Sequence, residues 1–197
     1  MKLFALLLGG AAVALAALNS TQEYRLKTCL KPGQAGKEQY DNLWLVSYHT
    51  GAGLSDATFM SAANKSSAIR GYLGPTNVTS SNGTKYYNQL FDLNNTFPFG
   101  LAMEENTNFY AGWEPVRLNA DVGSSFETNG FFINGTGLQW TSNTAQAGSS
   151  SDAFGGWLVC DWWHGAPQLF FRIRYYARYG FKTPSSCADV YLQPVYF

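Results

Sequence analysis

Residues 156–176 read GWLVCDWWHGAPQLFFRIRYY. Two runs of aromatic and branched apolar residues, which are enriched in β-strands, flank the segment 164–167, whose glycine and proline break a strand. We therefore expect an antiparallel hairpin with strands at 156–163 and 168–176. Its aromatic content predicts that this hairpin forms part of the protein core.

The same strand-like pattern recurs along the chain. Hydrophobic residues repeat mostly at every second position, and clusters of Gly, Asn, Ser and Pro separate the runs. Short strands at roughly ten-residue spacing, with no internal repeat of fixed period, predict an all-β fold, either an antiparallel β-sandwich or a barrel-like single domain. Further strands are expected at 23–30, 42–49, 57–61, 85–93, 97–103, 114–118, 130–133, 138–141 and 189–196, and a short helix within 56–72.

Two Asn-Gly pairs, Asn82-Gly83 and Asn134-Gly135, lie between apolar-rich runs. Asn-Gly is typical of the type I′ turn, in which both central residues have a positive φ. We expect hairpins with type I′ turns at both pairs.

The first residues have the pattern of a secretory signal peptide. Lys2 supplies a positive charge, residues 3–15 form an apolar region, and Ala14-Leu15-Ala16 has the small-x-small pattern of a cleavage site. The sequence predicts a signal peptide at 1–17 and a single secreted, extracellular β-rich domain at 18–197. The apolar region is shorter than the roughly 20 residues that a membrane-spanning helix needs, so no membrane span is expected.

Composition narrows the class of partner. The 13 basic and 13 acidic residues balance, and no basic cluster is visible in the sequence, which argues against capture of nucleic acid. Charged residues make up only 13% of the chain and aromatic residues 16%, which predicts a folded protein.

Asn-x-Ser/Thr sequons predict N-glycosylation on an exported chain. Apart from Asn19, they lie between 64 and 134, whereas 24–63 and 139–197 have none, so we expect a partner to dock on the surface formed by these last two segments. The predicted glycosylation sites are Asn64, Asn77, Asn82, Asn94 and Asn134.

Three cysteines allow three single disulfides in an oxidising compartment. We favour the pair Cys160–Cys187, because Cys29 lies on an alternating run whose apolar face is formed by Tyr24, Leu26 and Leu30. That phase points Cys29 toward solvent, where it is either a free thiol or the partner of a cysteine in another molecule.

Motifs of the common catalytic classes are missing from the sequence: Gly-x-Ser-x-Gly, His-Glu-x-x-His, Cys-x-x-Cys and the phosphate loop. His49 and His164 each follow an expected strand and could bind a metal together with Asp161 or Asp56. The more ordinary interpretation is that both histidines bond to backbone at turns, and we expect no metal and no cofactor.

Asp161 offers a different chemistry, because it lies between cysteine and two tryptophans. Burial against indoles would raise the pKa of its carboxyl, as a general acid of a carbohydrate-active enzyme requires. The alternative is an ordinary carboxylate at a sheet edge. Glu104 and Glu105 are adjacent and would point to opposite faces of a strand, so they are not a catalytic pair.

Aromatic residues suggest a binding surface instead. Trp162 and Trp163 are neighbours, so in a strand they face opposite sides and one of them is expected to be exposed beside His164. We expect binding residues at Trp162, Trp163, His164 and His49. The function expected is a non-enzymatic extracellular interaction module for a glycan or a protein. The alternatives are a lectin-like protein, a carbohydrate-active enzyme using Asp161, and a lipid carrier in a closed barrel.

Several motifs resemble those of one family: GGWLVCDW at 155–162, PQLFF at 167–171, SCADV at 186–190, YRLKT at 24–28 and LVSYHTGAG at 45–53. They are similar to small secreted proteins of filamentous fungi that are grouped as a domain of unknown function. The resemblance implies export, a single domain and a C-terminal cysteine pair, and it implies no catalytic residue.

Overall fold

The computed structural model describes residues 22–104, 112–122 and 129–197. The predicted signal peptide at 1–17 and the sequon at Asn19 lie outside these residues. The strands are β1 (Tyr24–Leu30), β2 (Trp44–Gly51), β3 (Leu54–Met60), β4 (Arg70–Thr79), β5 (Lys85–Asp92), β6 (Phe99–Met103), β7 (Trp113–Asn119), β8 (Phe131–Asn134), β9 (Gly137–Trp140), β10 (Phe154–Asp161), β11 (Pro167–Ile173) and β12 (Cys187–Tyr196). The helices are the 3₁₀-helices η1 (Glu38–Tyr40) and η2 (Ala62–Ser67) and the α-helix α1 (Arg174–Arg178).

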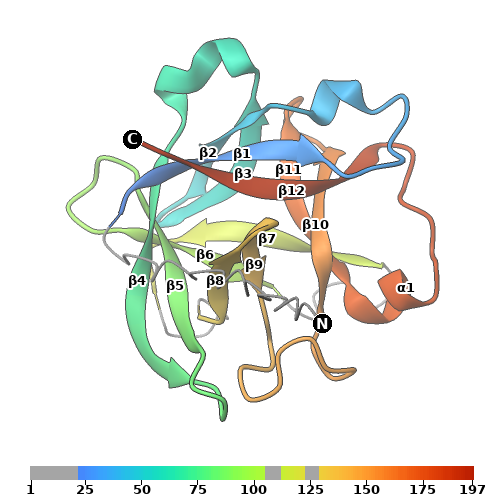
Figure 1. Cartoon of the computed structure of the whole chain (residues 1–197). Helices are drawn as coiled ribbons and strands as arrows, with labels where there is room; N and C mark the ends of the chain where they lie inside the picture. Colours follow the sequence, from blue (N-terminus) through green and yellow to red (C-terminus); the bar gives the residue numbers. More distant parts are fainter. Residues whose placement is uncertain (1–21, 105–111, 123–128) are drawn as a thin grey trace, which may run out of the picture.

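These strands form one antiparallel sheet, in which a barrel of nine strands is extended by further strands (Figure 1). The all-β prediction is confirmed, and of the two architectures expected the barrel is the one observed.

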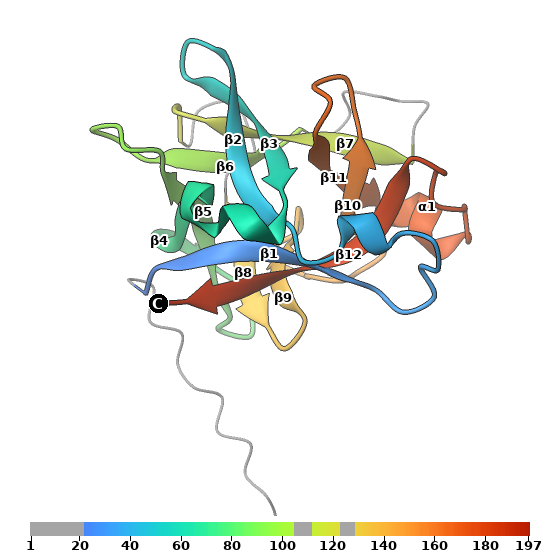
Figure 2. The same ribbon diagram turned by 90° about the horizontal axis from the view of Figure 1, so that it is seen from above.

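The two ends of the barrel are built from different strands. At one end β12 pairs with β1, β1 with β4, β4 with β5, β5 with β8 and β8 with β9, and β9 lies against β12. At the other end the hairpins β2–β3, β6–β7 and β10–β11 pair with one another, β3 with β7, β7 with β11 and β11 with β3 (Figure 2). This is the strand arrangement of a β-trefoil.

The fold therefore repeats a unit of four strands three times, which the sequence did not reveal. The units span 24–79, 85–134 and 137–196. Their loops and strands differ in length, so corresponding residues do not recur at a fixed period. The sequence thus has no repeat of fixed period, as expected, although the fold has a threefold repeat of strands.

Strand β4 was missed by the sequence analysis, and η2 occupies the place of the expected short helix. Gly71, Gly74 and Pro75 in β4 resemble turn residues, but the two glycines serve close packing. A Cβ atom at Gly74 would lie 2.5 Å from Leu90 Cδ1 of β5, and one at Gly71 would lie 2.9 Å from Gln89 Nε2. Strand β11 ends earlier than expected, because residues 174–176 begin α1.

The three expected hairpins are present, but the type I′ turns are not. Asn82 and Asn134 do not adopt a positive φ; the positive φ angles are 84° at Gly83 and 102° at Gly137. In the β8–β9 turn the Oδ1 atom of Asn134 accepts hydrogen bonds from the backbone N–H of Thr136 at 2.9 Å and from its hydroxyl at 2.7 Å. The Asn134 side chain thus stabilises the turn, while the Asn134 backbone does not adopt the positive φ of a type I′ turn.

The hairpin β10–β11 is buried on both faces, as its continuous apolar runs indicate. One face joins the main core, where Trp157 and Phe171 pack with residues of the other strands. Leu158, Cys160 and Phe170 on the other face form a smaller cluster with Cys187, against which Trp113 packs. The prediction that this hairpin belongs to the core is confirmed.

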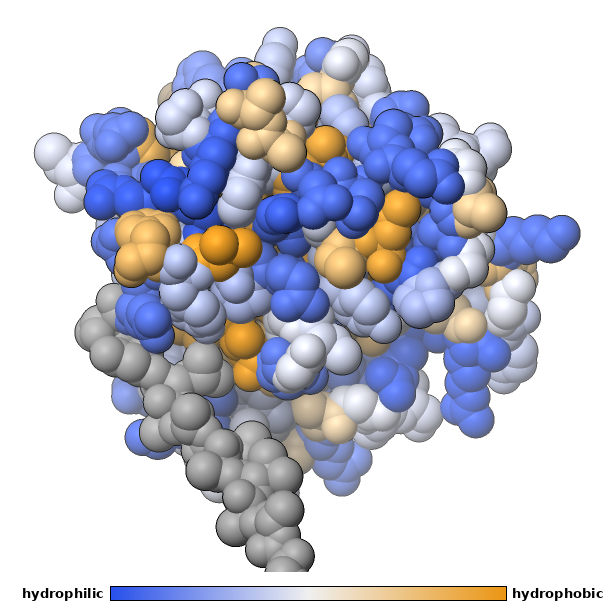
Figure 3. Space-filling view, turned by 45° about the horizontal axis from the view of Figure 1, so that its top comes forward, coloured by the Kyte–Doolittle hydropathy of each residue, from blue (hydrophilic) through white to orange (hydrophobic). Residues whose placement is uncertain are grey.

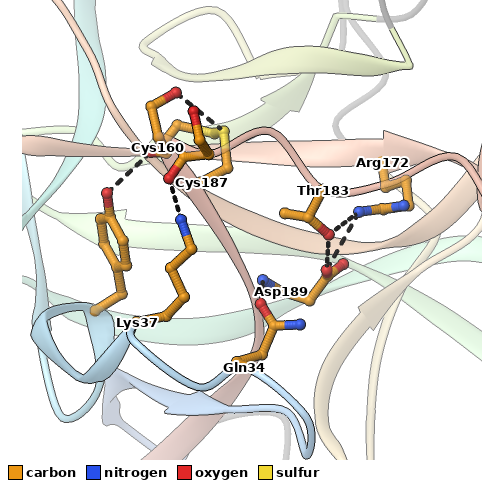
Figure 4. The surroundings of a disulfide bond; sticks show 10 residues. Gln34, Lys37, Cys160, Arg172, Thr183, Cys187 and Asp189 are labelled. Atoms are coloured by element: carbon orange, nitrogen blue, oxygen red, sulfur yellow. Dashed lines mark hydrogen bonds and ion pairs between the residues drawn. A yellow bond between two sulfur atoms is a disulfide. The ribbon is translucent and has the colours of Figure 1, made fainter.

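The predicted disulfide Cys160–Cys187 is present and joins directly paired residues of β10 and β12. Its surroundings, with Lys37 nearby, are shown in Figure 4. Lys37 and Tyr40 donate hydrogen bonds to the carbonyl oxygens of Ser185 and Ser186. The segment around η1 is thereby fastened to the start of β12. Cys29 is exposed and free, as its strand phase predicts.

The face seen in Figure 3 carries hydrophobic residues as small separate patches among hydrophilic ones. None of the helices in the described ranges has the length and apolar character that a membrane span requires. Binding sites are therefore best sought in hollows of the surface.

Removing the disulfide is expected to destabilise the protein without changing its fold. The bridge joins residues 27 positions apart, and closing a loop of this size corresponds to about 3 to 4 kcal/mol in the free energy of unfolding. Chemical denaturation of Cys160→Ala/Cys187→Ala should show this loss, whereas the control Cys29→Ser should stay within about 0.5 kcal/mol of the parent because its side chain is exposed. Equal stability of the double variant and the control would contradict this assignment.

Candidate functional site

A pocket of about 380 Å³ lies where the three hairpins meet. Leu54 and Asp56 come from β3, Trp113 and Arg117 from β7, and Gln168 from β11. Trp162 and Trp163 complete the wall from the β10–β11 turn. We call this hollow the indole pocket.

The two turn tryptophans are both accessible. Trp163 is 74% exposed and Trp162 is 48% exposed. Strand β10 ends at Asp161, so the two rings belong to the turn and the strand alternation that predicts only one exposed ring does not apply to them. Trp162 rests edge-on against Phe170, with 5.3 Å between ring centroids.

His164 supports Trp163 from within. Its ring lies between the rings of Tyr48 and Trp163, at centroid distances of 4.0 and 4.1 Å. Its Nε2 atom is 2.5 Å from Oδ2 of Asp56, and the side chains of both residues are nearly buried. His164 therefore positions Trp163 and is not itself an exposed contact residue.

The two histidines do not form a joint site. His49 is exposed on β2 and does not line the indole pocket, whereas His164 is held by Asp56. Over the described ranges, no group of three or more His, Cys, Asp and Glu residues is arranged to hold a metal.

Arg117 connects two buried carboxylates at the pocket. Its Nε atom is 3.2 Å from Oε1 of Glu104 and 4.0 Å from Oδ1 of Asp56. Burial raises the pKa of the Glu104 carboxyl above its usual value of 4.5; the Arg117 guanidinium opposes this rise, and the carboxylates of Asp56 and Glu114 add to it. A charge-assisted chain thus runs from Glu104 through Arg117 and Asp56 to His164.

Gln168 adds a polar group to the wall of the pocket. Its side chain is only 3% exposed, and its Oε1 atom has no hydrogen-bond donor among the residues that the structure describes. Buried acceptors are normally satisfied, so this oxygen is an exception among the described residues.

The premise for Asp161 as a general acid is wrong. Asp161 is exposed at the end of β10 and lies outside the indole pocket. Of the buried carboxylates, Asp56 lines the pocket and is bonded to His164, and Glu104 forms an ion pair with the lining residue Arg117.

Sequence analysis missed Trp113, Arg117 and Gln168 as site residues. Trp113, Pro115 and Arg117 occupy alternate positions of β7 and all line the pocket, whereas Val116 and Leu118 between and beyond them are buried in the core. The sequence shows this alternation only in part, because the buried positions of the strand include Glu114. The pairing of β7 with β11, which brings the face to the tryptophans, was not visible in the sequence.

A comparison with protein families decides the classification of the chain. The model of a family described as a domain of unknown function, DUF7907, matches residues 21–196. This chain belongs to that family. No curated protein matches it.

Among solved structures, a chain titled "Botulinum Neurotoxin Type G Receptor Binding Domain" is similar at a TM-score of 0.40 and 12% sequence identity. The match covers 89% of the present chain and 43% of the other. The chain thus spans less than half of that structure.

Substitution of Glu104 by glutamine is expected to change how stability depends on pH. The raised pKa means that the folded state holds the Glu104 proton more tightly than the unfolded chain does, so this carboxyl lowers stability as pH rises from 4.5 through its folded-state pKa. Glu104→Gln does not titrate. In urea denaturation at several pH values, the unfolding free energy of the variant should therefore increase relative to that of the parent as pH rises over this range.

Glu38→Gln is the matched control, because backbone hydrogen bonds from its own N–H and from that of Gly36 lower the pKa of the Glu38 carboxyl. The unfolding free energy of Glu38→Gln should decrease relative to that of the parent as pH rises from that lowered pKa toward 4.5. The same pH dependence in Glu104→Gln and its parent would contradict the assignment.

Proposed function

We propose that this protein is a secreted, N-glycosylated, non-enzymatic module that binds an extracellular glycan in the indole pocket. The observation that carries the proposal is the accessible pair Trp162 and Trp163 beside the polar groups of Asp56, Arg117 and Gln168. A sugar ring has an apolar C–H face, which packs on an aromatic ring, and hydroxyl groups at its edge, which need donors and acceptors. Ligand sites of this kind combine aromatic walls with a few placed polar groups.

The packing that holds the Trp163 ring in place favours ligand binding. Tyr48 and His164 stack beneath the indole, and the Asp56 carboxylate fixes the imidazole. A ring that is already held in place loses less conformational entropy when a ligand docks on it. The pocket is thus organised before the ligand arrives.

The sequons are compatible with this assignment. All five in the described ranges are exposed, and none belongs to the residues that line the indole pocket. Glycans on Asn82 and Asn134 would project from hairpin turns. Such a distribution leaves the pocket open to a large saccharide.

The alternatives have less support. A glycosidase needs two carboxyl groups facing its substrate, whereas Asp56 is the single carboxylate among the described lining residues and it is bonded to His164. A lipid carrier needs an internal cavity, but the barrel interior is filled with side chains such as Phe91, Trp140 and Phe171.

A polysaccharide array tests the proposal directly. The purified protein should bind at least one saccharide saturably, and Trp163→Ala should weaken that binding about tenfold or more because it removes the exposed platform. The control is Tyr179→Ala, which removes another exposed ring, 64% accessible, that does not line the pocket. Melting temperatures should stay close to that of the parent for both variants.

The outcomes separate the candidate functions. Equal loss of binding in both variants, or no loss in Trp163→Ala, would reject the indole pocket as the site. Release of reducing ends from a bound saccharide would show a hydrolase. Failure to bind any saccharide would turn the search to protein partners.

A further inference from the structure

A second hollow of about 620 Å³ lies at the opposite end of the β10–β11 hairpin, beside α1. Figure 1 shows where α1 lies. Lys31 enters it from the end of β1, and Arg174 and Arg178 enter it from α1. No acidic residue is among the described residues that line it. We call this hollow the basic pocket.

Lys31 lies at the wall of the pocket and forms no direct ion pair with a described carboxylate. Its Nζ atom lies 5.4 Å from the centre of the Tyr191 ring, and no acceptor of the described residues bonds to it. The β-bulge at Gly155 and Gly156 makes room for it, because a Cβ atom at Gly156 would lie 2.7 Å from Nζ. Glycine is also required there by a φ of 121°.

The two arginines present further donors. Arg174 uses Nη2 to bond the carbonyl oxygen of Gly148 at 2.5 Å, which ties the 143–152 loop to the pocket wall and leaves its other N–H groups free of described partners. Arg178 is exposed and has no described partner. Ser150 adds a hydroxyl group to the same wall.

The positive charges of Lys31, Arg174 and Arg178 are not balanced by any carboxylate among the described lining residues. Burial lowers the pKa of Lys31, the carboxylate of Asp189 opposes this effect, and the guanidinium of Arg172 adds to it. An anion in the pocket would offset the cost of burying the Lys31 charge. A guanidinium fork suits an oxyanion, since two N–H groups can donate to two of its oxygens.

We propose that the basic pocket is a binding site for a tetrahedral oxyanion group, a phosphate or sulfate ester carried on a larger ligand. Such a group has enough oxygens to face Lys31, Arg174 and Arg178 together, whereas a single carboxylate has two. The volume leaves room for part of the molecule that carries the group. This site is separate from the indole pocket and does not depend on its function.

Titration followed by amide NMR tests the proposal at constant ionic strength. The probes are inorganic phosphate, inorganic sulfate, glucose 6-phosphate and glucose 6-sulfate, with glucose as the uncharged comparison. We expect saturable shifts of the Gly148, Gly155 and Gly156 amide signals with the charged probes and none with glucose. Tighter binding of one ester than of the other identifies the preferred group.

Two variants locate the site. Lys31→Gln and Arg178→Gln should each weaken binding about tenfold, and Arg178 is exposed, so its replacement should leave folding intact. The control Lys85→Gln removes the same unit of charge from an exposed residue of β5, outside the pocket, and should leave binding unchanged. Shifts that fail to saturate, or that weaken equally in Lys85→Gln, would overturn the proposal.

Discussion

Aromatic packing around Trp157 holds together the parts of the molecule on which both pockets depend. The Trp157 indole donates a hydrogen bond to the carbonyl oxygen of Leu138 at 2.6 Å and packs edge-on against Phe154 at 4.8 Å between centroids. Trp140 contacts Phe171 in the same way at 5.6 Å. These contacts join β9, β10 and β11 in the core. Because the hairpin β10–β11 is fixed there, its turn and its opposite end are presented at defined places on the surface.

The two ends of this hairpin have contrasting chemistry. The turn presents indoles beside a chain of paired charges, in which Arg117 lies between Glu104 and Asp56 and the carboxylate of Asp56 bonds His164. The other end gathers Lys31, Arg174 and Arg178 without a lining acid in the described residues. Charge balance over the whole chain hides this contrast, since Lys31 is far in sequence from Arg174 and Arg178. The fold concentrates them, as it concentrates the tryptophans.

Local patterns predicted most of the strands, the hairpin turns' positions, the disulfide and the exposure of Cys29. They failed where a residue's role depends on a partner from another unit. Gly71 and Gly74 look like turn residues until β5 lies against them. In the sequence Arg117 and Gln168 resemble ordinary strand residues, and only the pairing of β7 with β11 brings them to the same pocket. His164 was predicted as a binding residue, whereas in the structure its nearly buried side chain contacts Tyr48 and Asp56 of the β2–β3 hairpin. Long-range strand pairing of this kind leaves no signal in a single sequence, and neither does a threefold repeat of unequal units.

We proposed above that the pocket formed by the three hairpins receives a sugar. The most direct measurement is a crystal structure of the protein with the saccharide that it binds most tightly. Binding in the indole pocket predicts a sugar ring packed on the indole of Trp163, with hydroxyl groups within hydrogen-bond distance of Gln168, Asp56 or Arg117. A saccharide bound elsewhere, with the indole pocket empty, would contradict it.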